Sequence, residues 1–179
     1  MPSKAWLKKR YAYLPQKAQL VLINKSLNRN VRVLSNLLNE YPKIHAIHSS
    51  LENGFIGLGS RTLAIRKWHK TVKSFPRIPN TYFQRASWAL ERSKFFEAAL
   101  YLRLCLKLDK GYFKTTAHFW RAEALYRLGN YSLAKRELKN VPNEYEELYF
   151  LNYKKRSKID LLNDICTKEN YRNQSYKSF

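Results

Sequence analysis

The stretch FWRAEALYRLGNYSLAKREL, Phe119 to Leu138, carries the pattern that decides the fold of this 179-residue chain. Apolar residues recur in it at steps of three and four, on both sides of Leu128-Gly129-Asn130. Such spacing places the apolar residues on one face of a helix, and the Gly-Asn pair favours a turn. The stretch therefore predicts two short amphipathic helices joined as a hairpin.

Similar units recur along the chain at a spacing of about 34 residues. One segment ends in a proline at Pro42, the next ends at Pro76, 34 residues later, and a final one ends at Pro142. Small residues keep the same spacing, since Ala64 lies 34 residues before Ala98. One hairpin cannot bury its apolar faces alone, whereas several stacked hairpins can. The period therefore indicates an array of stacked hairpins.

These units resemble the tetratricopeptide-repeat (TPR) family, whose period is 34 residues. The resemblance is carried by AEALYRLGNYSLAKREL, FFEAALYLRLCLKLD and SRTLAIRKWHKTVKSFP. It implies an all-α fold, a TPR-like solenoid of about four helical hairpins with terminal capping helices. The repeats are expected at residues 11–44, 45–78, 79–112 and 113–144.

The two ends of the chain are expected to differ from the repeats. Residues 1–10 predict a basic N-terminal capping helix, and residues 145–166 predict C-terminal capping helices that cover the end of the stack. Residues 167–179 are polar and predict a flexible tail. Within the second repeat, the three glycines of ENGFIGLG predict a loosened turn, because glycine weakens helix interiors.

Positive charge dominates the composition. The 34 Lys and Arg residues exceed the 13 Asp and Glu residues by 21. A field of this size attracts polyanions, which include nucleic acid, an anionic membrane face and an acidic protein. No run of apolar residues is long enough for a membrane span, and the charged N-terminus is a poor secretory signal. We expect a cytoplasmic protein, with peripheral attachment to a membrane as an alternative.

Many of the basic residues recur at helical spacing on the second helices of the expected hairpins, where they would point outward. The ordinary interpretation is a solvated face, but few carboxylates are interleaved, which favours a surface that binds anions. The candidate polyanion-binding residues are Arg66, Lys70, Lys73, Arg103, Lys107, Arg136 and Lys139.

The resemblance also implies that the first helices of the hairpins line a concave groove that binds a protein segment with apolar anchors. An alternative is that Phe83 and Phe119 pack against neighbouring helices. Some family members bind chaperones through a carboxylate clamp. We do not expect that clamp here, because Asn53 is the only residue of this chain that matches one of the clamp positions. The candidate groove residues are Asn53, Phe83, Ser87, Leu90, Phe119, Glu123 and Tyr126.

No pattern typical of an enzyme is found in the sequence. His45 and His48 could share one helical face, but no third metal ligand accompanies them. Cys105 has no recognisable histidine partner. The stretch GFIGLGS matches neither GxGxxG nor the Walker sequence, the two glycine-rich phosphate-binding motifs. We therefore expect no catalytic residue, metal, cofactor or small-molecule substrate.

Together these features predict a noncatalytic adaptor or scaffold that binds a protein partner in its groove and docks on an anionic partner by its basic outer face. Two alternatives use the same charge. One is a nucleic-acid-binding subunit of a ribonucleoprotein, and the other is a peripheral membrane subunit of an assembly or export machine. Salt separates them from groove binding, because phosphate contacts weaken steeply with ionic strength.

Overall fold

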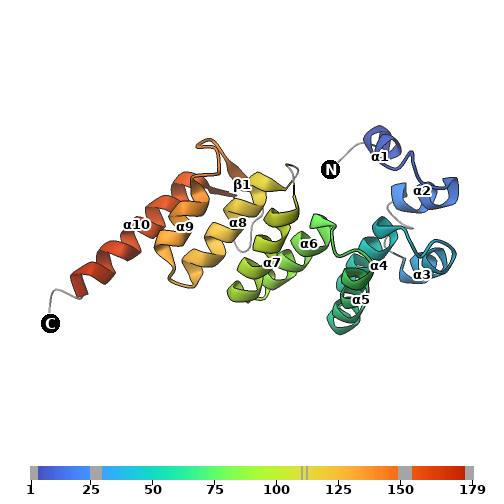
Figure 1. Ribbon diagram of the computed structural model, residues 1–179, viewed down its shortest axis with the longest axis horizontal. Helices are drawn as coiled ribbons and strands as arrows, with labels where there is room; N and C mark the ends of the chain where they lie inside the picture. Colours follow the sequence, from blue (N-terminus) through green and yellow to red (C-terminus); the bar gives the residue numbers. More distant parts are fainter. Residues whose placement is uncertain (1–3, 25–29, 110, 112, 149–154, 176–179) are drawn as a thin grey trace. The chain divides into compact units, whose positions relative to one another are not determined.

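The computed structural model describes residues 4–24, 30–109, 111, 113–148 and 155–175. The chain is mostly helical, and its described part contains one pair of short strands (Figure 1). The predicted all-α class is correct in this main feature. The chain divides after Pro76 into two compact units, an N-terminal unit and a C-terminal unit.

The N-terminal unit is built from helices only in its described part. Its core contains Leu34, Leu37, Ile47 and Leu51, each at most 3% exposed. Amphipathic spacing produces this core, because those leucines and the isoleucine recur at steps of three and four on their helices. The helices are α1 (Lys4–Arg10), α2 (Gln16–Ile23), α3 (Val31–Glu40), α4 (His45–Gly57) and α5 (Arg61–Ser74).

The C-terminal unit begins with four helices that follow one another as neighbours, each packed on the next (Figure 1). Its core contains Phe119, Ala122, Leu138 and Ile165, each at most 1% exposed. Its elements are α6 (Pro79–Glu91), α7 (Phe95–Leu108), α8 (Lys114–Arg127), α9 (Tyr131–Leu138), β1 (Glu146–Leu148), β2 (Lys155–Ser157) and α10 (Lys158–Ser175).

Three helix pairs, α4/α5, α6/α7 and α8/α9, are joined by the same type of turn. Gly59, Ser93 and Gly129 adopt positive φ values of 73°, 55° and 75°. In each turn the next amide bonds to the carbonyl five residues earlier, at 2.9 Å. This is the hydrogen bond that ends a helix in a Schellman motif. The bonds run from Ser60 to Phe55, from Lys94 to Ala89 and from Asn130 to Leu125.

The spacing of these pairs follows the spacing read in the sequence. Helices α4, α6 and α8 begin at residues 45, 79 and 114. The second helix of each pair carries one fully buried alanine, and these are Ala64, Ala98 and Ala134. A methyl side chain at a buried position lets neighbouring helices approach closely.

The C-terminal segment differs from the prediction of capping helices over residues 145–166. Its described part forms an antiparallel pair of strands, in which Glu147 lies opposite Arg156. The reason is that Tyr145 and Glu147 point inward while Glu146 is exposed, an alternation that suits a strand. In the described part of this segment, α10 covers the core of the C-terminal unit, because its Leu161 and Ile165 are fully buried there.

The predicted flexible tail is also corrected in part. Helix α10 continues through residues 167–175, and Lys135 on α9 pairs with Glu169. The Thr167 hydroxyl donates to the carbonyl of Asn163, inside the helix, at 2.9 Å. Residues 176–179 of the predicted tail lie outside the described residues.

Near the N-terminus, α1 lies within the segment predicted as a capping helix, of which residues 1–3 lie outside the described residues. The loosened turn predicted from ENGFIGLG does not occur in the described helix α4. That helix continues through Asn53 and Gly54 to Gly57, and Gly54 is buried. A glycine that lies against other residues allows close packing, which explains why the helix tolerates it.

Candidate interaction surfaces

Three of the predicted groove residues lie in the core of the C-terminal unit. Leu90 is 2% exposed, and Phe119 and Glu123 are fully buried. The ring of Phe119 packs at 5.2 Å from the ring of Tyr145, which is why it faces inward. These three side chains therefore belong to the interior and do not form a groove surface.

The other predicted groove residues keep some contact with solvent. Phe83 is half-buried and stacks between Phe113 and Trp120, with ring centroids 4.5 and 4.6 Å away. Ser87 and Tyr126 are half-buried as well. Asn53 is exposed on α4, in the N-terminal unit. That these four contact a partner stays a prediction.

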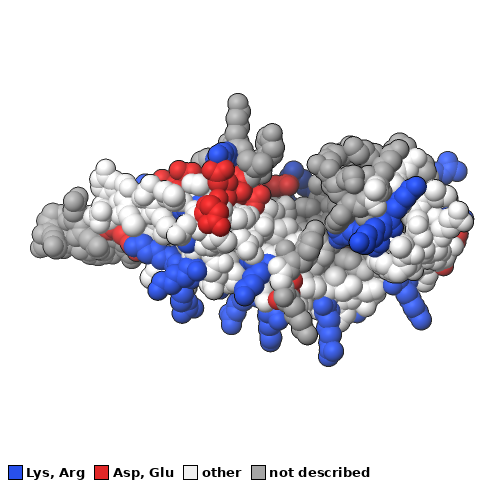
Figure 2. All heavy atoms as spheres, turned by 90° about the horizontal axis from the view of Figure 1, so that it is seen from above, with Lys and Arg blue, Asp and Glu red and all other residues white. Residues whose placement is uncertain are grey.

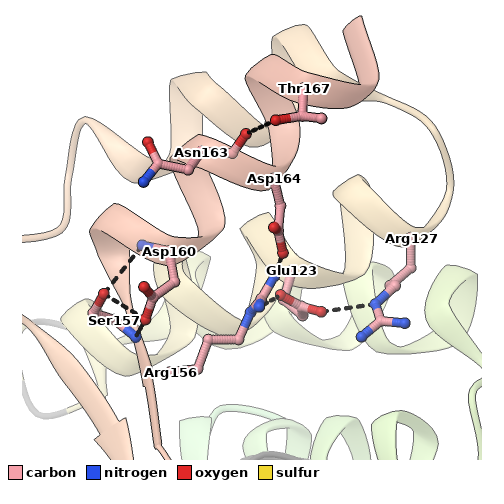
Figure 3. Close-up of polar contacts among 8 residues, drawn as sticks. All are labelled: Glu123, Arg127, Arg156, Ser157, Asp160, Asn163, Asp164 and Thr167. Carbon is pink, nitrogen blue, oxygen red and sulfur yellow. Dashed lines mark hydrogen bonds and ion pairs between the residues drawn. The ribbon is translucent and has the colours of Figure 1, made fainter. Parts of the chain in front are cut away.

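Glu123 occupies a buried ion-pair cluster that sequence reasoning missed (Figure 3). Its Oε1 accepts a hydrogen bond from Arg127 Nε at 2.8 Å, and its Oε2 accepts one from Arg156 Nε at 2.7 Å. Arg156 also donates to Asp164 at 2.9 Å. The cluster therefore joins α8, β2 and α10 in the C-terminal unit. The only sequence signal was the i, i+4 spacing of Glu123 and Arg127.

All seven predicted polyanion-binding side chains are exposed. Arg66, Lys70 and Lys73 recur along α5 at steps of four and three, and therefore share one face of that helix. Within the described part of the chain none of the seven forms an ion pair. The remaining four, which belong to the C-terminal unit, are Arg103, Lys107, Arg136 and Lys139.

The carboxylates are engaged elsewhere. Seven of the 13 acidic side chains form ion pairs among the described residues. In the part of Figure 2 that holds α7 to α9, the Lys and Arg side chains stand out along one edge, and most Asp and Glu side chains lie away from it. These seven acidic side chains thus neutralise other bases, and none of them pairs with a predicted basic residue.

A surface depression of about 550 Å³ lies in the C-terminal unit and is lined by residues of α7, α8 and α9. Two of the predicted basic residues, Arg103 and Lys107, belong to its lining. The other lining residues were not predicted, although Leu100 and Leu104 keep helical spacing with Arg103 and Lys107. They are Leu100, Leu104, Leu106, His118, Arg121 and Glu137.

Glu137 is the one acidic residue of that lining, and it is already paired. His118 Nδ1 lies 2.7 Å from its Oε2, and Arg121 forms an ion pair with its other oxygen. Burial opposes ionisation, but the hydrogen bond from His118 and the charge of Arg121 together lower the pKa of Glu137. The carboxylate is therefore ionised and compensated.

A second buried carboxylate, Glu52, lies in the N-terminal unit beside Thr71 and His48. Thr71 Oγ1 hydrogen bonds to Glu52 Oε1 and lies 3.4 Å from His48 Nδ1, and His48 Nε2 lies 2.8 Å from the carbonyl of Pro42. Burial raises the pKa of Glu52 to about 7, against the influence of Thr71 and of the charge on Lys67. Burial also lowers the pKa of His48.

The Thr71 hydroxyl donates to Glu52 Oε1 and lies 3.2 Å from a second acceptor, the carbonyl of Lys67. A neutral His48 that donates from Nε2 to the Pro42 carbonyl keeps Nδ1 as an acceptor. The cluster is therefore an internal chain of hydrogen bonds rather than an open acid–base site.

The described residues show no metal centre, since nowhere among them do three His, Cys, Asp or Glu side chains lie close enough to hold an ion. Cys105 is fully buried, and burial raises the pKa of its thiol to about 12. A thiol that stays protonated is a poor nucleophile. Among the helices of the described residues, none is both long and apolar enough to cross a membrane.

Comparison with known protein families and curated proteins found no relative. No protein-family model matches the chain, and no curated protein matches it in sequence.

Proposed function

We propose that this chain is a noncatalytic adaptor, a TPR-like solenoid of helical hairpins that binds a protein segment and docks on an anionic partner by its basic outer faces. The observation that carries the proposal is the state of the seven predicted basic side chains. All are exposed, and none forms an ion pair within the described residues.

Three features support the solenoid part of the proposal. The first helices of three pairs begin about 34 residues apart, each pair is joined by the same type of turn, and each second helix carries one fully buried alanine. Repeated units with equal contacts to their neighbours are what a solenoid requires. Hairpins of this kind present broad surfaces, and repeat proteins use such surfaces for binding.

The docking part rests on charge. An unpaired lysine or arginine on a surface interacts with a partner's anions without first breaking a bond inside its own protein. Paired carboxylates do not repel such a partner as strongly as free ones. A basic face with few free acids therefore raises both the association rate and the preference for an acidic partner.

The part concerning the protein segment is supported by the half-buried aromatic cluster of Phe83, Phe113 and Trp120. Partly exposed aromatic rings are common anchors at protein interfaces, because they bury a large area at a low entropic cost. Ser87 on α6 and Tyr126 on α8 are half-buried as well and stay candidates for contact with the segment.

A charge-reversal experiment tests the proposal. Lys70, Lys73, Arg103 and Lys107 are changed together to Glu, and binding to native partners is measured by co-purification from the host, with and without nuclease. The matched control reverses four other exposed bases and has the same net charge. The control positions are Lys43, Arg77, Arg92 and Lys168.

We expect the first variant to bind about tenfold more weakly than the control, with unchanged helical content by circular dichroism. If both variants bind equally, net charge alone determines the binding, and the proposal that particular basic faces dock on the partner is wrong. Nuclease sorts the partner class, because loss of all partners after nuclease treatment indicates nucleic acid. Retention of a specific protein indicates an adaptor.

A further inference from the structure

The depression bordered by α7, α8 and α9 contains an element that a purely anion-binding surface does not need. Its walls include the apolar side chains of Leu100, Leu104 and Leu106, beside Arg103 and Lys107. Its volume of about 550 Å³ falls within the range of pockets that bind ligands. A site with both kinds of lining is suited to a ligand that is apolar and anionic at once.

The apolar lining extends along α7 beyond the depression. Phe96, Leu100 and Leu104 recur at steps of four residues and therefore share one face of the helix. Phe96 is 73% exposed and Leu100 is 45% exposed, although both are large apolar residues. Arg103 and Lys107 follow Leu100 by three and seven residues, so they border the same face. The face thus combines apolar and basic groups at helical spacing.

The acidic residue of the lining does not oppose an anionic ligand. Glu137 is paired with both His118 and Arg121 and is 6% exposed. Arg103 and Lys107 are exposed and have no ion-pair partner among the described residues. The net charge that the depression presents to a ligand is therefore positive.

We propose that this depression binds an acidic amphipathic helix of a partner protein. An apolar side chain of that helix enters between Leu100 and Leu104, and its neighbouring carboxylates lie beside Arg103 and Lys107. Charge complementarity selects the acidic partner, and the helical spacing of the lining selects a helix whose anchors recur at three and four residues. The inference rests on the proposed function and assigns the adaptor's docking to one site.

The test uses a fluorescent peptide of about 18 residues, long enough for five helical turns. Its leucines recur at steps of three and four, and its other residues are mostly glutamate. A second peptide has the same composition in an order without helical spacing. Binding of each to the full chain is measured by fluorescence anisotropy. The expected result is that the amphipathic peptide binds about tenfold more tightly.

Substitutions then locate the site. Leu100→Ser should weaken binding of the amphipathic peptide about tenfold, because it removes an apolar contact from an exposed position. Arg103→Glu with Lys107→Glu should have at least the same effect, whereas Arg103→Lys with Lys107→Arg should retain binding. Matched controls in the N-terminal unit are Leu58→Ser and Arg32→Glu with Lys43→Glu, whose side chains are exposed and lie outside the predicted basic positions. A separate variant, Arg66→Glu with Lys70→Glu, reverses the charge of the docking face on α5. Circular dichroism checks that each variant keeps its helices.

The outcomes separate this inference from the proposed function. If charge reversal on α7 weakens binding but Leu100→Ser and peptide order do not, the depression has no apolar anchor and the inference fails, while anionic docking stands. If a single-stranded RNA of equal charge competes equally well, the occupant is not a protein helix. If neither the α5 nor the α7 reversal affects any anionic ligand, the inference and the docking faces both fail.

Discussion

The two units of the chain bury a carboxylate in different ways. In the N-terminal unit Glu52 is 1% exposed, and its one hydrogen-bond partner among the described residues is the uncharged hydroxyl of Thr71. In the C-terminal unit Glu123 is fully buried and lies between two guanidinium groups, those of Arg127 and Arg156. Both carboxylates lie on the first helix of a helical pair, so position in the fold does not explain the difference.

The difference follows from the partners that each unit supplies. A buried carboxylate is tolerated when it stays protonated or when opposite charges and hydrogen bonds compensate it. One oxygen of Glu52, Oε2, is buried without a hydrogen-bond partner in the described residues, which an ionised group could scarcely sustain. The first unit should therefore respond to pH, and the second to loss of a basic partner.

The largest expected effect comes from removing the buried basic partner. Arg156→Met should lower the free energy of unfolding by about 3–5 kcal/mol, because Glu123 would remain as a buried charge with only the half-exposed Arg127 beside it. Chemical denaturation of the purified variant measures the loss.

A double variant sharpens this result. Glu123→Leu combined with Arg156→Met removes both charges, and replacement of a buried ion pair by apolar groups is often neutral. The double variant should recover most of the stability lost by Arg156→Met alone. The control Lys155→Met, in the same strand, breaks only an exposed ion pair with Glu146 and should change stability by less than about 1 kcal/mol. Equal losses in the single and double variants would mean that packing, not charge, sets the cost.

The pH response of Glu52 is the next largest effect. Its pKa is raised to about 7 in the folded protein, from 4.5. The folded state then holds a proton that the unfolded state releases, so this group's stabilising contribution is complete below pH 4.5 and is lost as the pH rises through 7. Glu52→Gln removes that slope. The stability of the variant relative to wild type should therefore rise by about 2–3 kcal/mol between pH 5 and pH 8.

The relative measurement also removes an opposing influence. Burial and the neighbouring His48 lower the pKa of His45 to about 4, so His45 destabilises the fold as the pH falls below 6.5. This slope has the opposite sign, and both proteins share it. Urea denaturation at several pH values provides the comparison. A stability difference that does not change with pH would show that the pKa of Glu52 is not raised in the folded protein.

Local periodicity predicted much of the helical structure, because a helix is specified by residues three and four apart. The hairpin unit read from Phe119 to Leu138 corresponds to parts of α8 and α9 with a turn at Gly129. The strands were missed because they depend on pairing between distant residues, such as Glu147 with Arg156. The acidic residues Glu144, Glu146 and Glu147 follow Pro142, a pattern that resembles the start of a helix. The neighbouring sequence does not reveal the basic residues that pair with them.

The candidate sites divide along the same line. Exposed basic residues could be predicted, since a charged residue at an outward helical position rarely has an alternative to solvent. The buried state of Glu123 could not, because it depends on Arg156, 33 residues away. The depression also escaped prediction, as it requires side chains from three helices at once.

The smallest expected effect tests whether the two units share one turn. Gly59 and Gly129 adopt nearly equal positive φ values, and an added Cβ would meet no atom within 4 Å at either position. Alanine at each should therefore cost only its backbone strain, about 1 kcal/mol in both units. Ser93 already bears that strain at φ 55°, so Ser93→Gly should stabilise the C-terminal unit, by about 0.5 kcal/mol once the freer unfolded chain is counted. Thermal unfolding of the three variants measures these shifts. If the two alanine substitutions lower the stability by different amounts, the turns at Gly59 and Gly129 do not contribute equally to the stability of their units, despite their similar φ values.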